Sequence, residues 1–243
     1  MSTAPQAATA AIIPDQAPRR LLPACLSASA GKLAQRISEF NRFPTRYAHP
    51  SWWPQGWGPD WKKGIIADSR SEARLGEAML QHWELPYRPC FDFGAPMRRL
   101  ALLDPAPLNR LVLLAGLARH AEEISRIIVR SQVQKLRFQI GEEAYKFVLL
   151  RAPLLTGQLP AGDGATETTD WAERATFTGL SMLSACLGPE LQIMSGRVSL
   201  KFSRGMIEAW DVKPCPEAPE VLFRLFRKVL LQEVEPAWDV IFS

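Results

Sequence analysis

The sequence predicts a mainly α-helical, irregular domain that carries one small β-hairpin in its C-terminal part. Three observations predict this fold class. Apolar residues recur at helical spacing in several stretches, prolines and glycines separate those stretches, and one short stretch near the C-terminus alternates apolar with polar residues. With 243 residues, 47% of them hydrophobic, the chain can bury a core without metal or disulfide support.

The composition divides the chain into three parts. Residues 1–35 are rich in Ala, Pro, Ser and Thr, so they carry little apolar surface to bury, and we expect a flexible tail. Residues 36–158 are expected to form a helical lobe around a central helical hairpin. After a loop-like stretch, residues 170–243 are expected to form a smaller lobe of helix, β-hairpin and helix. Each lobe is small for independent folding, so we treat the two as one domain.

The first lobe opens with a segment dense in proline and aromatic residues, over residues 43–61. Its prolines forbid a continuous helix. A helix is expected over residues 72–83, because Asp68 or Ser69 can accept hydrogen bonds from the first free amides of that helix.

The clearest helical signal starts at Asp104, an N-cap residue type, with Pro105 at the first helical position. Over residues 108–118 apolar side chains fall on all sides, so this half of the helix should be buried all round. Beyond it, apolar and charged residues separate onto two sides, so the helix should surface. A second helix is expected over residues 132–150, folding back as a hairpin or continuing after a kink near Ser131.

The second lobe should begin with a helix that Thr169 or Asp170 caps and that ends at Gly188. It should close on another helix after Pro219.

Between those two helices lies the predicted β-hairpin. Residues 198–203 alternate apolar and polar side chains, the pattern of a half-buried strand on which Lys201 faces outward. Arg204 and Gly205 form a plausible turn into a second strand ending near Trp210.

Composition and motifs exclude several function classes. The net charge of +4, from 29 basic and 25 acidic residues, indicates a mixed surface rather than the basic one of a typical nucleic-acid binder. The four cysteines lack C-x-x-C spacing, which favours reduced, packed thiols and no metal. Neither a G-x-S-x-G nucleophile motif nor a phosphate-binding glycine loop occurs, so we expect no catalytic set and no cofactor.

The apolar runs are too short for a membrane span, which needs about 18 residues. The N-terminus also lacks the basic region of a secretory signal. We therefore expect a cytosolic protein with no direct membrane insertion.

Two groups of residues are candidate partner-binding sites. Trp52, Trp53 and Trp57, in the proline-rich segment, stack on bases, anchor a partner protein or fill gaps between helices, and the packing role is favoured.

The second group is an arginine face on the central helix, formed by Arg119, Arg126 and Arg130. These side chains either contact an acidic partner or phosphates, or form a solvated face. Because Glu122 lies four residues before Arg126 and Glu123 lies beside the same face, the solvated face is favoured.

The order of these elements resembles a known family. The run from Leu100 through Asp104-Pro105 to the leucine-rich stretch and Ile124 resembles the central helix of the SctK (YscK, PscK) family of type III secretion. The upstream Phe40-Asn41-Arg42-Phe43-Pro44 and Tyr47-Ala48-His49-Pro50-Ser51-Trp52 segments are similar to the opening of that family. The similarity is clearest over residues 40–160.

This resemblance implies a non-enzymatic accessory component of the injectisome sorting platform, at the cytoplasmic face of the secretion apparatus of a bacterium. Such a protein bridges the cytoplasmic domain of the inner-membrane ring protein (SctD) and the pod protein (SctQ). The pod connects onward to SctL and the SctN ATPase. The alternatives are a helical nucleic-acid-binding regulator and, third, a small hydrolase that uses Cys90 or Cys186.

Overall fold

The computed structural model describes residues 27–54, 56, 68–157, 170–188, 192–211 and 215–242, and every regular element in these ranges is a helix. The α-helices are α1 (Ser27–Arg42), α2 (Pro44–Tyr47), α4 (Ser69–His82), α5 (Pro105–Arg119), α6 (Ala121–Ser125), α7 (Arg130–Ile140), α8 (Glu142–Leu150), α9 (Ala152–Thr156), α10 (Trp171–Leu187), α11 (Gln192–Ser199), α12 (Arg204–Ala209), α13 (Pro219–Val229) and α14 (Asp239–Phe242). Short 3-10 or π turns are η2 (Pro50–Trp52), η3 (Pro96–Leu102), η4 (Leu230–Val234) and η5 (Pro236–Trp238).

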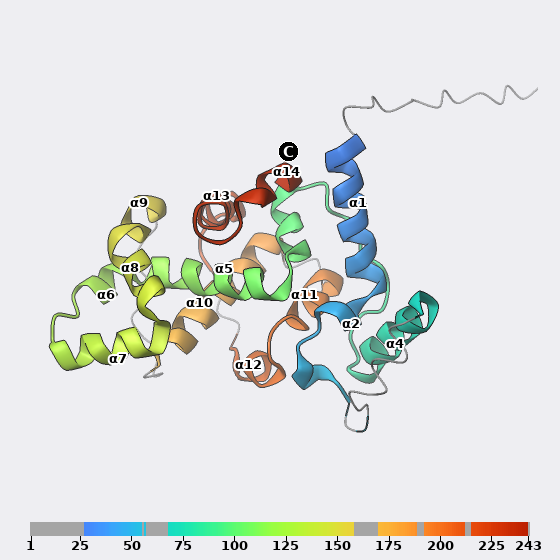
Figure 1. Ribbon diagram of the computed structural model, residues 1–243, viewed down its shortest axis with the longest axis horizontal. Helices are drawn as coiled ribbons and strands as arrows, with labels where there is room; N and C mark the ends of the chain where they lie inside the picture. Colours follow the sequence, from blue (N-terminus) through green and yellow to red (C-terminus); the bar gives the residue numbers. More distant parts are fainter. Residues whose placement is uncertain are drawn as a thin grey trace, which may run out of the picture.

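Helices α5 and α10 cross at the centre of the molecule, where two glycines let the backbones touch (Figure 1). A Cβ on Gly116 would lie 1.8 Å from the carbonyl oxygen of Ala175, and a Cβ on Gly179 would lie 2.0 Å from that of Val112. Only glycine permits this approach. The remaining elements pack around the crossing: α13 contacts both helices, and α8 and α9 lie against α5.

Over residues 108–118 of α5 the expected burial is confirmed for the apolar side chains, with Leu113 partly buried, whereas the polar Arg110 is exposed. Leu108, Leu111, Leu114 and Leu117 are at most 3% exposed although they point in different directions around the helix. Helices α8, α9, α10 and α13 cover most of α5, which explains why its apolar residues show no single stripe.

Several helix starts also agree with the sequence. The Asp68 carboxylate accepts hydrogen bonds from the first amides of α4, and Asp170 does the same for α10, which ends before Gly188. Asp104 precedes α5 as expected, but its side chain makes no capping hydrogen bond. Its carboxylate instead accepts two hydrogen bonds from Arg36, at 2.8 and 2.9 Å, and so joins α1 to the start of α5.

The central helical hairpin is more broken than expected. The chain leaves helical geometry at His120, again between Arg126 and Val129, and at Gly141, whose φ is +85°. Ile127, Ile128 and Val129 are three consecutive β-branched residues, a run with low helix propensity. Two expected helices therefore become α5 to α9, which double back at one end of the molecule (Figure 1).

The predicted β-hairpin is wrong, since no strand occurs among the described residues. Residues 198–203 lie at the end of α11 and in the turn before α12, where Lys201 N and Phe202 N donate to carbonyls three residues back. An alternation of apolar and polar side chains over only six residues does not distinguish a strand from the end of a helix. The tail expected over residues 1–35 also overlaps α1, which begins at Ser27.

Lys201 was expected to face water, yet it is 2% exposed. Its Nζ donates to the carbonyl oxygens of Ala101, at 2.6 Å, and Leu103, at 2.5 Å, and it lies over the rings of Phe40 and Tyr47. Burial lowers the pKa of Lys201 to about 7. The chain thus ties the second expected lobe to the first through a lysine in the interior.

Arg197 is a second buried cation that joins segments distant in the sequence. Its guanidinium donates to the carbonyl oxygens of Asn41, at 3.1 Å, and Tyr87, at 3.0 Å. Cations are favourable at the C-terminal ends of helices, where unpaired carbonyls gather, and Asn41 lies in the last turn of α1. Arg197 therefore fixes α1, the segment after α4 and α11 against one another.

We predict that Gly179→Ala lowers the free energy of unfolding by about 3 kcal/mol, because α5 and α10 must separate to admit the new methyl group. Gly205→Ala, in α12 with open space around it, should change the same quantity by no more than about 0.5 kcal/mol. Urea denaturation followed by circular dichroism measures both. Equal stability of the two variants would contradict the close crossing.

We also predict a pH dependence of stability that belongs to Lys201. The ordinary lysine pKa is 10.5, so between pH 7 and 10.5 the unfolded chain binds more protons at this residue than the folded chain. The contribution of Lys201 to the free energy of unfolding should therefore rise with pH, by up to about 1.4 kcal/mol per pH unit.

Denaturation of the natural chain and of Lys201→Met at several pH values measures this effect. The thiols of Cys186 and Cys215, whose pKa values burial raises to about 12 and about 11, act in the opposite direction in both proteins. Their effect cancels in the difference between the two proteins. If that difference does not change with pH, Lys201 does not titrate as proposed.

Candidate functional site

The tryptophans of the proline-rich segment lie at different depths. Trp52 is 6% exposed, its Nε1 donates to the carbonyl oxygen of Phe202 at 2.8 Å, and its own carbonyl accepts from Trp83 Nε1 at 2.6 Å. The Trp52 and Trp83 rings pack edge to face. Trp53 is half-buried, and Trp57 lies outside the described residues. Trp52 thus connects the proline-rich segment to the turn after α11.

Arg119 is an interior residue. It forms an ion pair with Glu217, and the two side chains are only 9% and 7% exposed. Cys215 Sγ lies 2.8 Å from the same carboxylate. Burial raises the pKa of Glu217. The hydrogen bonds that its carboxylate accepts from Cys215 and Arg119 nevertheless hold this pKa below its ordinary value. This pair fastens the end of α5 to the segment that leads into α13.

Arg126 and Arg130 lie on the surface, apart from Arg119. The pairing of Arg126 with Glu122 expected from their spacing is confirmed, with both side chains exposed. Arg130 is exposed at the first residue of α7. The predicted arginine face is divided because the chain turns away from the α5 axis at His120.

A cluster of polar side chains holds this break in place. His120 Nε2 lies 2.9 Å from Thr178 Oγ1, and its Nδ1 lies 3.5 Å from Glu123. Arg174 makes two hydrogen bonds to Glu123 and stacks on Trp171. Burial, followed by the charge of Arg174, lowers the pKa of His120 to about 4, so the ring is neutral at pH 7. Because His120 is only 3% exposed, we assign this cluster to folding.

The two cysteines considered as nucleophiles of a hydrolase both lie in the interior. Cys90 and Cys186 are buried, and burial raises the pKa of the Cys186 thiol to about 12, which leaves it protonated at pH 7. Among the described residues, no three His, Cys, Asp or Glu side chains gather closely enough to hold a metal ion. In the same part of the chain, no helix is both long and apolar enough to cross a membrane.

Exposed apolar residues, which sequence analysis did not single out, gather at two ends of the molecule. Ile128 and Val129 lie just before α7 and Phe138 lies in its last turn; all three are exposed, Phe138 to 91%, and we call this part of the molecule the α7 surface. At the other end, Tyr87 and Phe91 are 59% and 70% exposed. They line a groove of about 610 Å³ with residues of α1 and α4, the α1–α4 groove. Figure 1 shows α7 and α4 at opposite ends of the long axis.

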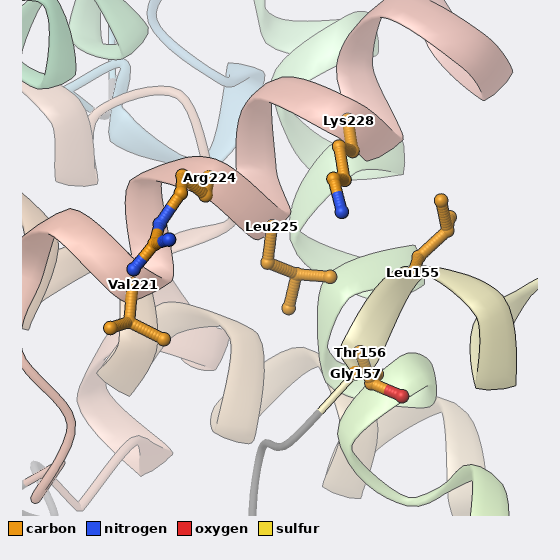
Figure 2. Close-up of a pocket in the computed structure, with 7 residues that line it drawn as sticks. All are labelled: Leu155, Thr156, Gly157, Val221, Arg224, Leu225 and Lys228. Carbon is orange, nitrogen blue, oxygen red and sulfur yellow. The ribbon is translucent and has the colours of Figure 1, made fainter.

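A third surface feature is a groove of about 370 Å³ between α9 and α13, the α9–α13 groove. Leu155, Val221 and Leu225 supply its apolar lining, and Arg224 and Lys228 project from α13 (Figure 2). Thr156 and Gly157 complete it. The groove combines apolar contact with positive charge.

The described part of the chain is therefore a helical protein with exposed apolar surfaces at separate positions. A family model described as YOP proteins translocation protein K (YscK) matches residues 36–238. The chain belongs to the YscK family, and it is a protein of type III secretion. This confirms the resemblance seen in the sequence and extends it beyond residue 160. Neither the curated proteins nor the solved structures gave a match.

We predict different stability effects for two of the candidate arginines. Arg119→Gln should lower the free energy of unfolding by about 3 kcal/mol, because it leaves Glu217 buried without its cation. Arg126→Gln should lower it by no more than about 0.5 kcal/mol, because the pair with Glu122 is exposed. Chemical denaturation measures both, and a similar loss in the two variants would contradict the interior position of Arg119.

Proposed function

We propose that this chain is a non-enzymatic cytoplasmic adaptor of the type III secretion injectisome. In this proposal it belongs to the sorting platform and links the cytoplasmic domain of the inner-membrane ring protein (SctD) to the pod protein (SctQ). Through the pod it connects to SctL and the SctN ATPase. Membership of the YscK family over residues 36–238 supports a role in the secretion machinery.

The structural observation that carries the adaptor role is the separation of two exposed apolar surfaces. The α7 surface and the α1–α4 groove lie at opposite ends of the molecule (Figure 1). Exposed apolar groups that cluster on a folded protein mark sites of association, because water is displaced from them on binding. Two such sites at opposite ends of one helical protein would let it hold two proteins at once.

Some of the candidate partner-binding residues support this proposal, and others do not. Arg126 and Arg130 flank the exposed Ile128 and Val129 along the chain, so we propose that they supply charge at the rim of the α7 surface. Trp52 and Arg119 are buried, and we assign them to the support of the fold. Partner binding by Trp53 and Trp57 stays a prediction.

The alternative of a nucleic-acid-binding regulator gains no support from the arginines. Arg119 and Arg126 are both paired with carboxylates. Phosphate binding favours an uncompensated row of cations, and the break at His120 divides the row that the sequence suggested.

We predict that the purified chain captures both the cytoplasmic domain of the ring protein and the pod protein of the same secretion system. Ile128→Ser with Phe138→Ser should lose one partner, and Tyr87→Ser with Phe91→Ser should lose the other. Each loss should exceed about tenfold in affinity, because exposed aromatic anchors contribute most to such contacts. Pull-down followed by isothermal titration calorimetry measures these effects.

Val240→Ser is the matched control. Val240 is an exposed apolar residue of α14, outside both surfaces, so this variant should keep both partners. If the natural chain binds neither protein, the adaptor function is wrong. If it binds both and every variant keeps both, the function stands and these two surfaces are not the contacts.

A further inference from the structure

The α9–α13 groove has a chemistry that neither apolar surface shares. Leu225 is buried at its base, while Leu155 and Val221 are partly exposed along it. Leu154, which precedes Leu155 on α9 but does not line the groove, is 78% exposed. An apolar segment that covered this groove would remove these groups from water.

Two cations stand on the α13 side of the groove. Arg224 and Lys228 are exposed, and neither has an ion-pair partner among the described residues. They are four residues apart on α13, so they lie one helical turn, about 6 Å, from each other along its axis. Figure 2 shows the Lys228 amine directed between Leu225 and Leu155, and the Arg224 guanidinium directed past Val221. The positive charge is thus held beside the apolar lining.

Two other charged residues around Arg224 and Lys228 are already paired, and Glu220, four residues before Arg224 on α13, is exposed but forms no ion pair with it. Arg227, on the same helix, pairs with Asp239. Glu233, just beyond α13, pairs with Arg151 at the junction of α8 and α9. None of the described residues that line the groove is acidic. The groove therefore keeps an uncompensated charge of two cations.

We infer that the α9–α13 groove binds an acidic amphipathic helix of a partner protein, a role that rests on the adaptor function for the source of that helix. Carboxylates one turn apart on such a helix match the spacing of Arg224 and Lys228. Leucine-type side chains on its apolar face cover Leu155, Val221 and Leu225. Nucleic acid fits less well, because a phosphate backbone has no apolar face to cover these residues.

The probe is a fluorescein-labelled peptide of leucine and glutamate in amphipathic helical order, titrated with the full chain by fluorescence anisotropy. We expect saturable binding that weakens with salt, because screening reduces the attraction between exposed charges. Arg224→Gln with Lys228→Gln should weaken binding by about tenfold. Arg227→Gln is the matched control on the same helix and should change binding by less than about twofold.

Three outcomes would overturn the inference: no binding of the peptide, equal binding of a leucine and lysine peptide, or equal binding by the double variant. Binding of labelled duplex DNA that the double variant loses, without peptide binding, would assign the groove to nucleic acid. Residues 158–169 follow Gly157 directly and contain Asp163 and Glu167. If Asp163→Asn with Glu167→Gln strengthens peptide binding by about tenfold, the occupant is that segment instead.

The groove inference and the adaptor function can fail independently of each other. If the chain captures the ring and pod proteins and the double variant captures both equally well, the groove inference fails while the adaptor function stands. If the natural chain captures neither protein, the adaptor function fails, whereas the peptide titration still reports on the groove.

Discussion

The contact on which the rest of the structure depends is the crossing of α5 and α10 at Gly116 and Gly179. Because each glycine lies against the backbone of the opposite helix, the two axes come closer than side chains would allow. This close approach buries most of α5 and gives α13, α8 and α9 a common body to pack against.

Around that body, the chain satisfies the ends of its helices with buried or half-buried cations. Arg197 and Lys201 donate to backbone carbonyls, and Arg36 binds the carboxylate that precedes α5. Each contact joins segments that are distant in the sequence. Among these cations, Lys201 has an unfavourable desolvation free energy, because burial disfavours its charged form. The two carbonyls and two aromatic rings around it offset part of this free energy.

The interior accounts for two of the residues that sequence analysis selected as functional, and other candidates come from the exposed surface. Trp52 and Arg119 hold segments together, whereas Phe138, Tyr87 and Phe91 are exposed without a packing role for most of their surface. The proposed adaptor role needs this division: a core that fixes geometry, and separate apolar or basic surfaces available to partners. The α9–α13 groove adds positive charge to the apolar contacts.

The sequence by itself determined the helical class, the caps at Asp68 and Asp170, the burial of α5 and the family, because these depend on local hydrogen bonding, periodicity and motif order. Only the tertiary structure decided that residues 198–203 end a helix and that Lys201 turns inward. Alternation over six residues fits either conformation, and the carbonyls that receive Lys201 lie about a hundred residues away. The candidate surfaces were hidden for the same reason, since exposure depends on which neighbours the fold brings to each side chain.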